Sequence, residues 1–214
     1  MSLSRRRAFL SLSTAAAASM AGARSAFAAG QVLTQGERDR AMSHMHGTSK
    51  LFLDSVAGLS AAQWNFKAGP DRWSIAECAE HIAASETFIF GVIQQMVKSP
   101  NAASAEDLAK TKGKDEVVIK GVPDRTQKFQ APEPIKPKKM ASDPLDYVAK
   151  FKTARFANIA YVEKTQDPLR EKVGPHPALG PLDAYQWMLL LSAHTERHTL
   201  QILEVKQAAG YPAA

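Results

Sequence analysis

Residues 187–205 read WMLLLSAHTERHTLQILEV. Apolar side chains and two histidines recur there at steps of three and four, which is the period of one face of an amphipathic helix. The predicted face consists of Trp187, Leu191, His194, His198, Ile202 and Val205. Two imidazoles on a face that points into the core need polar partners, because a buried polar group without hydrogen bonds is costly. The stretch therefore predicts a core helix that carries a polar site.

A metal ion is one partner that would satisfy both rings. His194 and His198 lie four residues apart, which turns a helix by about 40° and advances it by about 6 Å, so both rings project from one side. His81, in another predicted helix, supplies a third ligand if the two helices pack side by side. We therefore predict a mononuclear metal site made of these three histidines. The alternative is that all three are ordinary hydrogen-bonded core or surface side chains.

The ligand type limits the chemistry of such a site. Three neutral imidazoles leave positions open for water or substrate, which is typical of catalytic rather than closed structural sites. A metal held in this way lowers the pKa of a bound water or polarises a substrate group. Imidazole suits zinc, nickel, copper and iron, so the ligands predict a divalent ion, zinc, nickel or similar, without selecting one.

Helices are predicted over residues 34–58 and 74–98, on either side of a short loop. Two capping boxes mark where they begin, Thr34 with Glu37 and Ser74 with Glu77. Their predicted inward faces are Ala41, Met45, Phe52 and Val56 in the first, and Ile75, Cys78, Ile82, Ile89 and Ile93 in the second.

The third helix is expected to begin with Asp143 as N-cap and Pro144 in the first turn, and to stop before Asp167. Its predicted face is Leu145, Val148, Phe156, Ile159 and Val162. The fourth, which contains the opening stretch, is expected to run from Pro181 to about Ala209. Four long helices without a strand-period pattern predict an all-α fold, a four-helix bundle.

A proline-rich connection, residues 98–142, joins the second and third helices. It contains Pro100, Pro123, Pro132, Pro134 and Pro137. A connection of this length is either functional or loosely ordered, and it has the reach to cover the mouth of a site. Residues 117–119, Val-Val-Ile, are expected to form a short strand or a docked extended piece.

The N-terminus has the features of an export signal. Arg5, Arg6 and Arg7 precede Phe9 and an Ala/Ser/Leu-rich stretch, and residues 26–28, Ala-Phe-Ala, form a cleavage site. The arginine pair indicates the twin-arginine type. We predict a signal peptide over 1–28, a short linker over 29–33, the helical domain over 34–210, and a periplasmic location.

Removing the signal changes the charge balance. Lys plus Arg falls from 27 to 23 while Asp plus Glu stays at 21, so the formal net charge falls from +6 to +2. There is no basic stripe with interleaved aromatic residues, so nucleic acid is not an expected partner. No stretch after the signal has the roughly 18 uninterrupted apolar residues of a membrane span. A small-molecule substrate or ligand is expected instead.

Other polar residues near the three histidines are weaker candidates. Glu77 is a weak candidate for the general base, although its spacing from Ser74 favours a capping role. Cys78 lies three residues before His81, and as the one cysteine it forms no intramolecular disulfide; a small core residue is the expected role. Gln201 follows His198 on the same side of its helix and is placed to bond a ligand.

The remaining histidines and the charged neighbours of the pair receive mostly structural interpretations. His44 and His46 lie two residues apart and cannot share a helix face. His176 lies in a rigid Gly-Pro-His-Pro segment before the fourth helix, where it could approach the mouth of a site. Glu196 and Arg197 are expected to form surface or inter-helix salt bridges.

Two motifs carry a resemblance to a known family. Residues 73–77, Trp-Ser-Ile-Ala-Glu, followed by His81 and Glu86, and residues 194–202, HTERHTLQI, resemble the DinB-like superfamily. The resemblance extends from about Thr34 to Ala209, with 98–142 as the variable part. It implies an up-down-down-up four-helix bundle, often dimeric, with a divalent metal on His81, His194 and His198.

The same resemblance implies several possible activities. Similar proteins include thiol-dependent S-transferases and a mycothiol-dependent isomerase. The predicted export signal sets this chain apart, because low-molecular-weight thiols are mainly cytoplasmic. We expect an exported metal-dependent hydrolase or transferase that acts on a small molecule. The long helices are compatible with a homodimer. The alternatives are a non-catalytic, stress-associated bundle with a structural metal and a simple ligand-binding protein.

Overall fold

The computed structural model describes residues 32–138 and 143–213. The predicted signal peptide and residues 29–31 of the linker lie outside these residues. The four long helices are α1 (Gln35–Val56), α3 (Ile75–Lys98), α6 (Leu145–Lys164) and α7 (Ala184–Lys206). The predicted all-α four-helix bundle is confirmed. No helix within the described ranges combines the length and apolar character that crossing a membrane requires.

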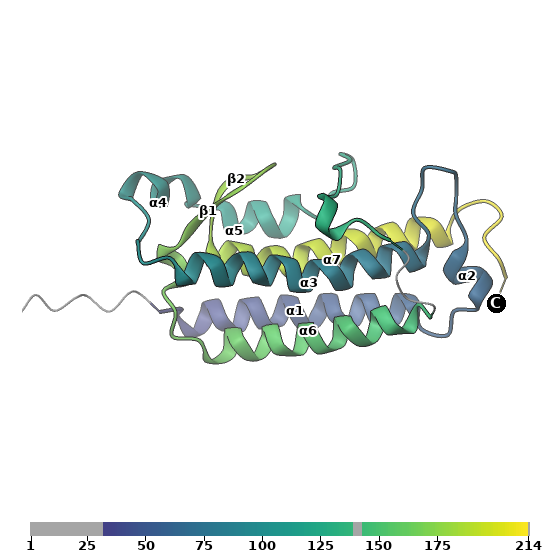
Figure 1. The fold of residues 1–214 in the computed structure, drawn as a ribbon, viewed down its shortest axis with the longest axis horizontal. Helices are drawn as coiled ribbons and strands as arrows, with labels where there is room; N and C mark the ends of the chain where they lie inside the picture. The colour runs from purple at the N-terminus through teal and green to yellow at the C-terminus, as the bar shows by residue number, and fades with distance from the viewer. Residues whose placement is uncertain (1–31, 139–142, 214) are drawn as a thin grey trace, which may run out of the picture.

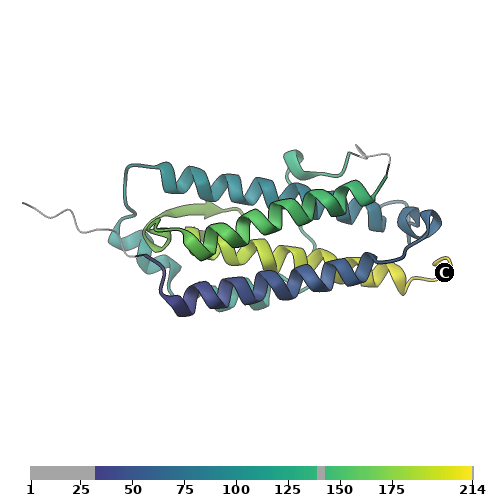
Figure 2. The same ribbon diagram turned by 90° about the horizontal axis from the view of Figure 1, so that it is seen from below.

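The bundle has the up-down-down-up order of helix directions (Figures 1 and 2). α1 and α7 run one way along the bundle, and α3 and α6 run the other. α1 packs against α6 and α7, and α3 packs against the same two helices. Because α3 and α6 are parallel, the chain must return along the whole bundle between them, which explains the long connection.

Capping boxes begin three of the long helices. Those of α1 and α3 are the two predicted, Thr34 with Glu37 and Ser74 with Glu77. α6 begins one residue later than expected: Pro144 is its N-cap, while Asp143 Oδ1 accepts a hydrogen bond from the backbone N–H of Leu145 at 2.9 Å. A short helix, α2 (Ala61–Asn65), lies between α1 and α3.

A β-hairpin precedes α7, in a region where no strand was predicted. Strands β1 (Val173–His176) and β2 (Gly180–Asp183) pair antiparallel after a 3₁₀ turn, η3 (Leu169–Glu171). The expected start of the fourth helix at Pro181 is therefore wrong. Asp183 is the N-cap of α7, and its carboxylate accepts from the N–H of Gln186 at 2.7 Å.

The connection between α3 and α6 is folded over the α3–α7 side of the bundle (Figure 1). It contains α4 (Ala105–Thr111), α5 (Lys114–Glu116), a π-helical turn η1 (Val117–Gly121) and a 3₁₀ turn η2 (Glu133–Ile135). The expectation of an extended piece at residues 117–119 is wrong, because they lie in the π-helical turn. η1 packs against α7, and η2 packs against α3.

The core consists of two apolar clusters on either side of a polar layer. The inward faces predicted for α1 and α3 are buried. The face predicted for α6 is wrong at Leu145 and Phe156, which are 57% and 77% exposed. The inward residues of α6 are Tyr147, Val148, Phe151, Arg155, Asn158 and Val162. Two polar residues point inward, so the apolar residues alone give the wrong phase.

The polar layer joins all four helices around one buried ion pair. Arg155 of α6 donates to Glu86 of α3 through Nε, at 3.0 Å, and through Nη2. Its Nη1 also donates to the carbonyl of Met45 and to Thr48 on α1, at 2.9 and 3.0 Å. Thr195 of α7 accepts from Arg155 at 2.8 Å. The layer therefore links all four long helices at one level of the bundle.

Candidate metal centre

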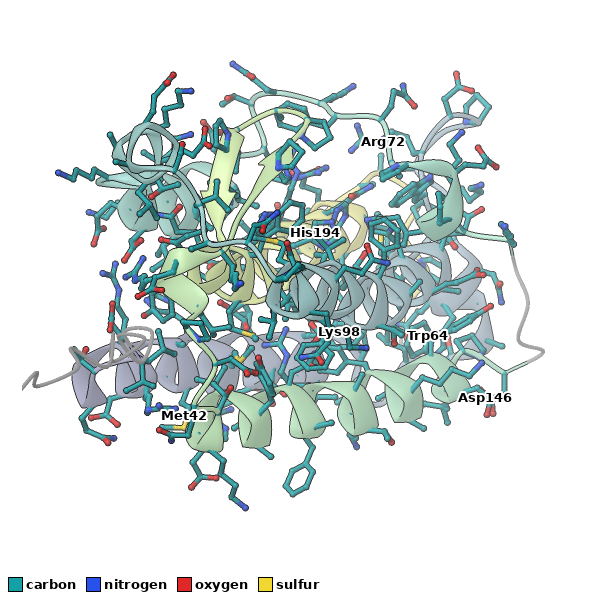
Figure 3. The ribbon with its side chains drawn as sticks, turned by 60° about the vertical axis from the view of Figure 1, so that its left-hand side comes forward. Met42, Trp64, Arg72, Lys98, Asp146 and His194 are labelled. Carbon is teal, nitrogen blue, oxygen red and sulfur yellow. The ribbon has the colours of Figure 1, made fainter. Side chains whose placement is uncertain are left out.

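α3 and α7 bring the three predicted histidines together. One ring nitrogen from each of His81, His194 and His198 lies within 4.8 Å of the other two. The Nε2 atoms of His81 and His194 are 3.2 Å apart. Figure 3 shows His194 in the half of the bundle opposite α1 and α6. The antiparallel packing of α3 on α7 thus places one histidine of α3 beside the pair on α7.

Hydrogen bonds to two of the rings determine which nitrogens are available to a metal. Nδ1 of His81 donates to the backbone carbonyl of Ile135, at 2.7 Å. Nδ1 of His198 donates to Oε1 of Gln201, at 3.0 Å. A carbonyl or amide oxygen can only accept, so each Nδ1 carries the proton and each Nε2 keeps its lone pair. Such bonds from the second ring nitrogen are what orients histidine ligands in metal sites.

Burial keeps the three rings neutral. Desolvation lowers the pKa of His81 to about 4, although its bond to Ile135 acts in the opposite direction. Desolvation also lowers the pKa values of His194 and His198 well below the usual range, and the neighbouring imidazoles add to both shifts. All three are therefore neutral at pH 7, which is the form that binds a metal.

The donor set fits a divalent transition metal. Two nitrogens bound at about 2.0–2.1 Å in tetrahedral geometry lie about 3.3 Å apart, close to the separation of His81 and His194. Within the described residues the cluster contains these three donors. Three protein ligands leave positions for water or substrate.

One wall of the centre is aromatic. The ring of Trp73 lies 4.9 Å from that of His81 and stacks on that of His198 at 5.8 Å, measured between centroids. His81 and His198 are 1% and 8% exposed, whereas His194 is more accessible. Trp73 therefore covers the centre on one side, and His194 is the most exposed of the three histidines. The sequence placed Trp73 in a motif but did not predict this contact.

Arg197 attaches the connection to α7 beside the centre. Its guanidinium donates to the backbone carbonyls of Val122, at 3.0 Å, and of Asp124 and Gln127. The predicted salt bridge of Arg197 is therefore wrong, because its partners are loop carbonyls. Nearby, Arg125 pairs with Glu204 of α7 at 3.0 Å. Together with the carbonyl of Ile135, these contacts make the connection part of the site.

Glu77 and Cys78, the weaker candidates beside His81, have contacts that indicate structural roles. The carboxylate of Glu77 accepts from the backbone N–H of Ser74 at 2.7 Å and pairs with Lys67 at 2.9 Å. Its expected capping role is confirmed. Cys78 is fully buried in the apolar core, and burial raises the pKa of its thiol. A thiol that stays protonated is a poor metal ligand.

The other described histidines are not members of the three-histidine cluster. His46 is exposed and His44 half-buried on α1. His176 ends β1, and its ring lies 5.2 Å from that of Trp187. Its Nδ1 accepts from the backbone N–H groups of Ala178 and Leu179, at 3.2 and 3.1 Å.

Comparisons with known proteins agree with this architecture. YuaE, an uncharacterized protein of Bacillus subtilis (strain 168), is 27% identical over 160 residues, which cover 72% of this chain and 90% of YuaE. A solved structure, YfiT from Bacillus subtilis, superposes with a TM-score of 0.57 at 11% identity, over 85% of this chain and 93% of that one. YfiT is described as a probable metal-dependent hydrolase with an unusual four-helix bundle topology.

The likeness to YfiT concerns the fold, whereas the match to a family model identifies the protein family. The model of the DinB superfamily matches residues 44–202, which include all three histidines and both motifs. This chain belongs to the DinB superfamily.

Proposed function

We propose that this protein is a metal-dependent hydrolase of small molecules, with one divalent ion held by His81, His194 and His198. The observation that carries the proposal is the convergence of three neutral imidazoles. In two of them, His81 and His198, Nδ1 donates a hydrogen bond to an oxygen of the protein. The description of YfiT as a probable metal-dependent hydrolase supports the same chemistry on a related fold.

The residues of the chain bind, orient and shield. Ile135 and Gln201 accept hydrogen bonds from Nδ1 of His81 and His198. These bonds orient the two rings and leave Nε2 of each as the atom that would bind the metal. Trp73 excludes water from one side of the rings. When bound, a divalent metal at such a centre supplies Lewis-acid activation of water or of a substrate oxygen.

The test combines metal content with a hydrolysis screen. Purified protein loaded with zinc or nickel is assayed against small esters, amides and phosphoesters, beside His194→Ala. We expect hydrolysis of at least one class by the loaded parent and its loss in the variant and after chelation. A parent that binds metal but hydrolyses no substrate class would favour the non-catalytic bundle, and transfer to an added acceptor in place of water would indicate a transferase.

We also propose that the protein is exported. The twin arginines, the mild apolar stretch and the Ala-Phe-Ala site at 26–28 support this. Fractionation of cells that express the full chain should place the shortened protein in the periplasm. Replacing Arg6 and Arg7 by Lys should retain it, unshortened, in the cytoplasm. Equal export of both forms would contradict a twin-arginine route.

A further inference from the structure

One part of the connection, residues 122–138, is attached to both helices that carry the three histidines. We call these residues the strap. On α7 the attachment is made by Arg197, which lies between His194 and His198 in the chain. On α3 it is made by His81 itself. The strap therefore joins α3 and α7 at the level of the predicted metal ligands.

The attachment to α7 consists of a buried guanidinium and backbone carbonyls. Arg197 is 6% exposed. Its guanidinium donates to the carbonyls of Val122, at 3.0 Å, and of Asp124 and Gln127. Its Cζ also lies 5.1 Å from the ring centroid of Phe129. Because the N–H donors of a guanidinium are held in one rigid plane, Arg197 fixes three strap residues relative to α7 at once.

A second arginine, Arg125, attaches the same part of the strap to α7. It pairs with Glu204 through Nε, at 3.0 Å, and through Nη2, at 3.1 Å. Glu204 also pairs with Arg72, at 3.2 Å. Arg72 precedes Trp73, whose ring covers one side of the centre. The strap is therefore linked through Glu204 to the segment that shields the histidines.

The attachment to α3 is made by Ile135 and Lys138. The carbonyl of Ile135 accepts from Nδ1 of His81 at 2.7 Å, and the residue is 6% exposed. The backbone N–H of Lys138 donates to Oε1 of Glu80 at 2.9 Å. Both hydrogen bonds thus end on a predicted metal ligand or on the residue directly before it.

Between these attachments the strap has little structure of its own. Residues 122–132 form no helix or strand, and residues 126–130 are exposed. A segment with few buried contacts and an exposed backbone opens locally at a small cost in free energy. The position of the strap beside the histidines therefore depends on its attachments to α7 and α3.

The bond from His81 to Ile135 makes the strap sensitive to the state of the ring. With a metal on Nε2 the ring keeps its proton on Nδ1, and this is the form that donates to a carbonyl. Without a metal, a neutral imidazole can instead carry its proton on Nε2. Nδ1 would then turn a lone pair towards the carbonyl oxygen, and the strap would lose this attachment. Metal binding and strap docking therefore favour the same form of His81.

We propose that metal binding and docking of the strap strengthen each other, and that Arg197 is the positioning residue that holds the strap against the centre. This inference rests on the proposed metal-dependent function and adds a regulation of its site. Coupling between two binding equilibria is reciprocal. The factor by which zinc suppresses opening of the strap therefore equals the factor by which the docked strap raises zinc affinity.

Hydrogen exchange followed by mass spectrometry tests the coupling without an assay of activity. Metal-free protein is compared with and without zinc, and zinc affinity is measured by competition with a chelator. The variants are Arg197→Met, which removes the guanidinium but keeps a long side chain, and Arg125→Gln. The matched control is Arg40→Gln, because Arg40 of α1 pairs with Glu116 of the same connection, outside the strap. Exchange in α6 serves as the internal reference.

We expect zinc to slow exchange in the strap about tenfold or more in the parent, with no comparable change in α6. Loss of a contact that supports a metal ligand typically weakens metal affinity by about 10–100-fold. Arg197→Met should therefore bind zinc about tenfold more weakly or worse, and its strap should exchange fast with and without zinc. Arg125→Gln should show the same changes to a smaller extent, and Arg40→Gln should match the parent in both measurements.

The outcomes separate this inference from the metal function on which it rests. A parent that binds zinc without any slowing of strap exchange would refute the coupling and leave the metal function intact. A helical Arg197→Met protein with parent zinc affinity would refute the positioning role, and if that variant is not helical, parent values in Arg125→Gln would do so. A folded parent that takes up no zinc would refute the metal function itself, and the inference with it.

Discussion

Replacing Glu86 by Gln removes one charge from the buried layer that joins the four helices. Glu86 and Arg155 are 1% and 2% exposed. Besides Arg155, the Glu86 carboxylate accepts from Asn158 at 3.0 Å and from Thr195 at 3.1 Å. In Glu86→Gln the guanidinium stays buried with neutral acceptors only, which include the carbonyl of Met45. Removing one partner of a buried ion pair costs about 3–5 kcal/mol.

That cost is a large share of the free energy of unfolding, which is typically about 5–15 kcal/mol for a domain. It corresponds to a fall in Tm of about 6–20 °C for a chain of this size. The measurement is urea unfolding followed by circular dichroism at 222 nm, with equal m-values for parent and variant as the condition for comparison. Asp54→Asn is the control, because Asp54 pairs with Lys50 on the exposed surface of α1.

The control should change the free energy of unfolding by no more than about 0.5 kcal/mol, as exposed i,i+4 pairs do. The double variant Glu86→Leu with Arg155→Met should be more stable than Glu86→Gln, because it removes the uncompensated charge. A loss below about 1 kcal/mol in Glu86→Gln would refute the reasoning that the layer is dry and the pair essential.

Three further predictions follow from individual contacts. Gln201→Leu removes the acceptor for His198 and should weaken metal binding about 10–100-fold, measured by competition with a chelator; unchanged affinity would contradict the orienting role. The fold lowers the pKa of His81 from 6.5 to about 4, so protonation of this ring favours the unfolded chain. About 3 kcal/mol of the unfolding free energy of the metal-free protein, fully present above pH 6.5, is therefore lost as the pH falls towards 4, and urea midpoints that stay flat between pH 7 and 4 would disagree. Phe151→Ala should lower the free energy of unfolding by about 3–5 kcal/mol, whereas Phe156→Lys should change it by less than about 0.5 kcal/mol. A larger loss in Phe156→Lys than in Phe151→Ala would instead support Phe156 as an inward residue of α6.

The sequence predicts most of the bundle because the apolar period in α1, α3 and α7 is regular. The Thr34 and Ser74 capping boxes locate two helix starts to the residue. In α6 the period fails, because Arg155 and Asn158 occupy inward positions and Phe156 points to solvent. A buried arginine is predictable only together with Glu86, which lies 69 residues earlier in the chain.

The three-histidine cluster is predictable in its members and not in the contacts that support them. His194 and His198 share a helix face with apolar residues, and this places them inward together. The acceptor for His81 is a backbone carbonyl, of Ile135, which has no side-chain signature in a sequence. The three carbonyls bound by Arg197 are hidden for the same reason. The hairpin strands have four residues each and contain Gly and Pro, so they fall below what alternation can indicate.

The most direct test of the account is elemental analysis of the purified protein, beside the double variants His194→Ala/His198→Ala and His44→Ala/His46→Ala. The parent and the α1 variant should each carry about one divalent metal ion per chain, and the α7 variant should carry none while remaining helical. A folded parent that takes up neither zinc nor nickel, or an α7 variant that keeps one equivalent, would contradict a metal centre at His81, His194 and His198.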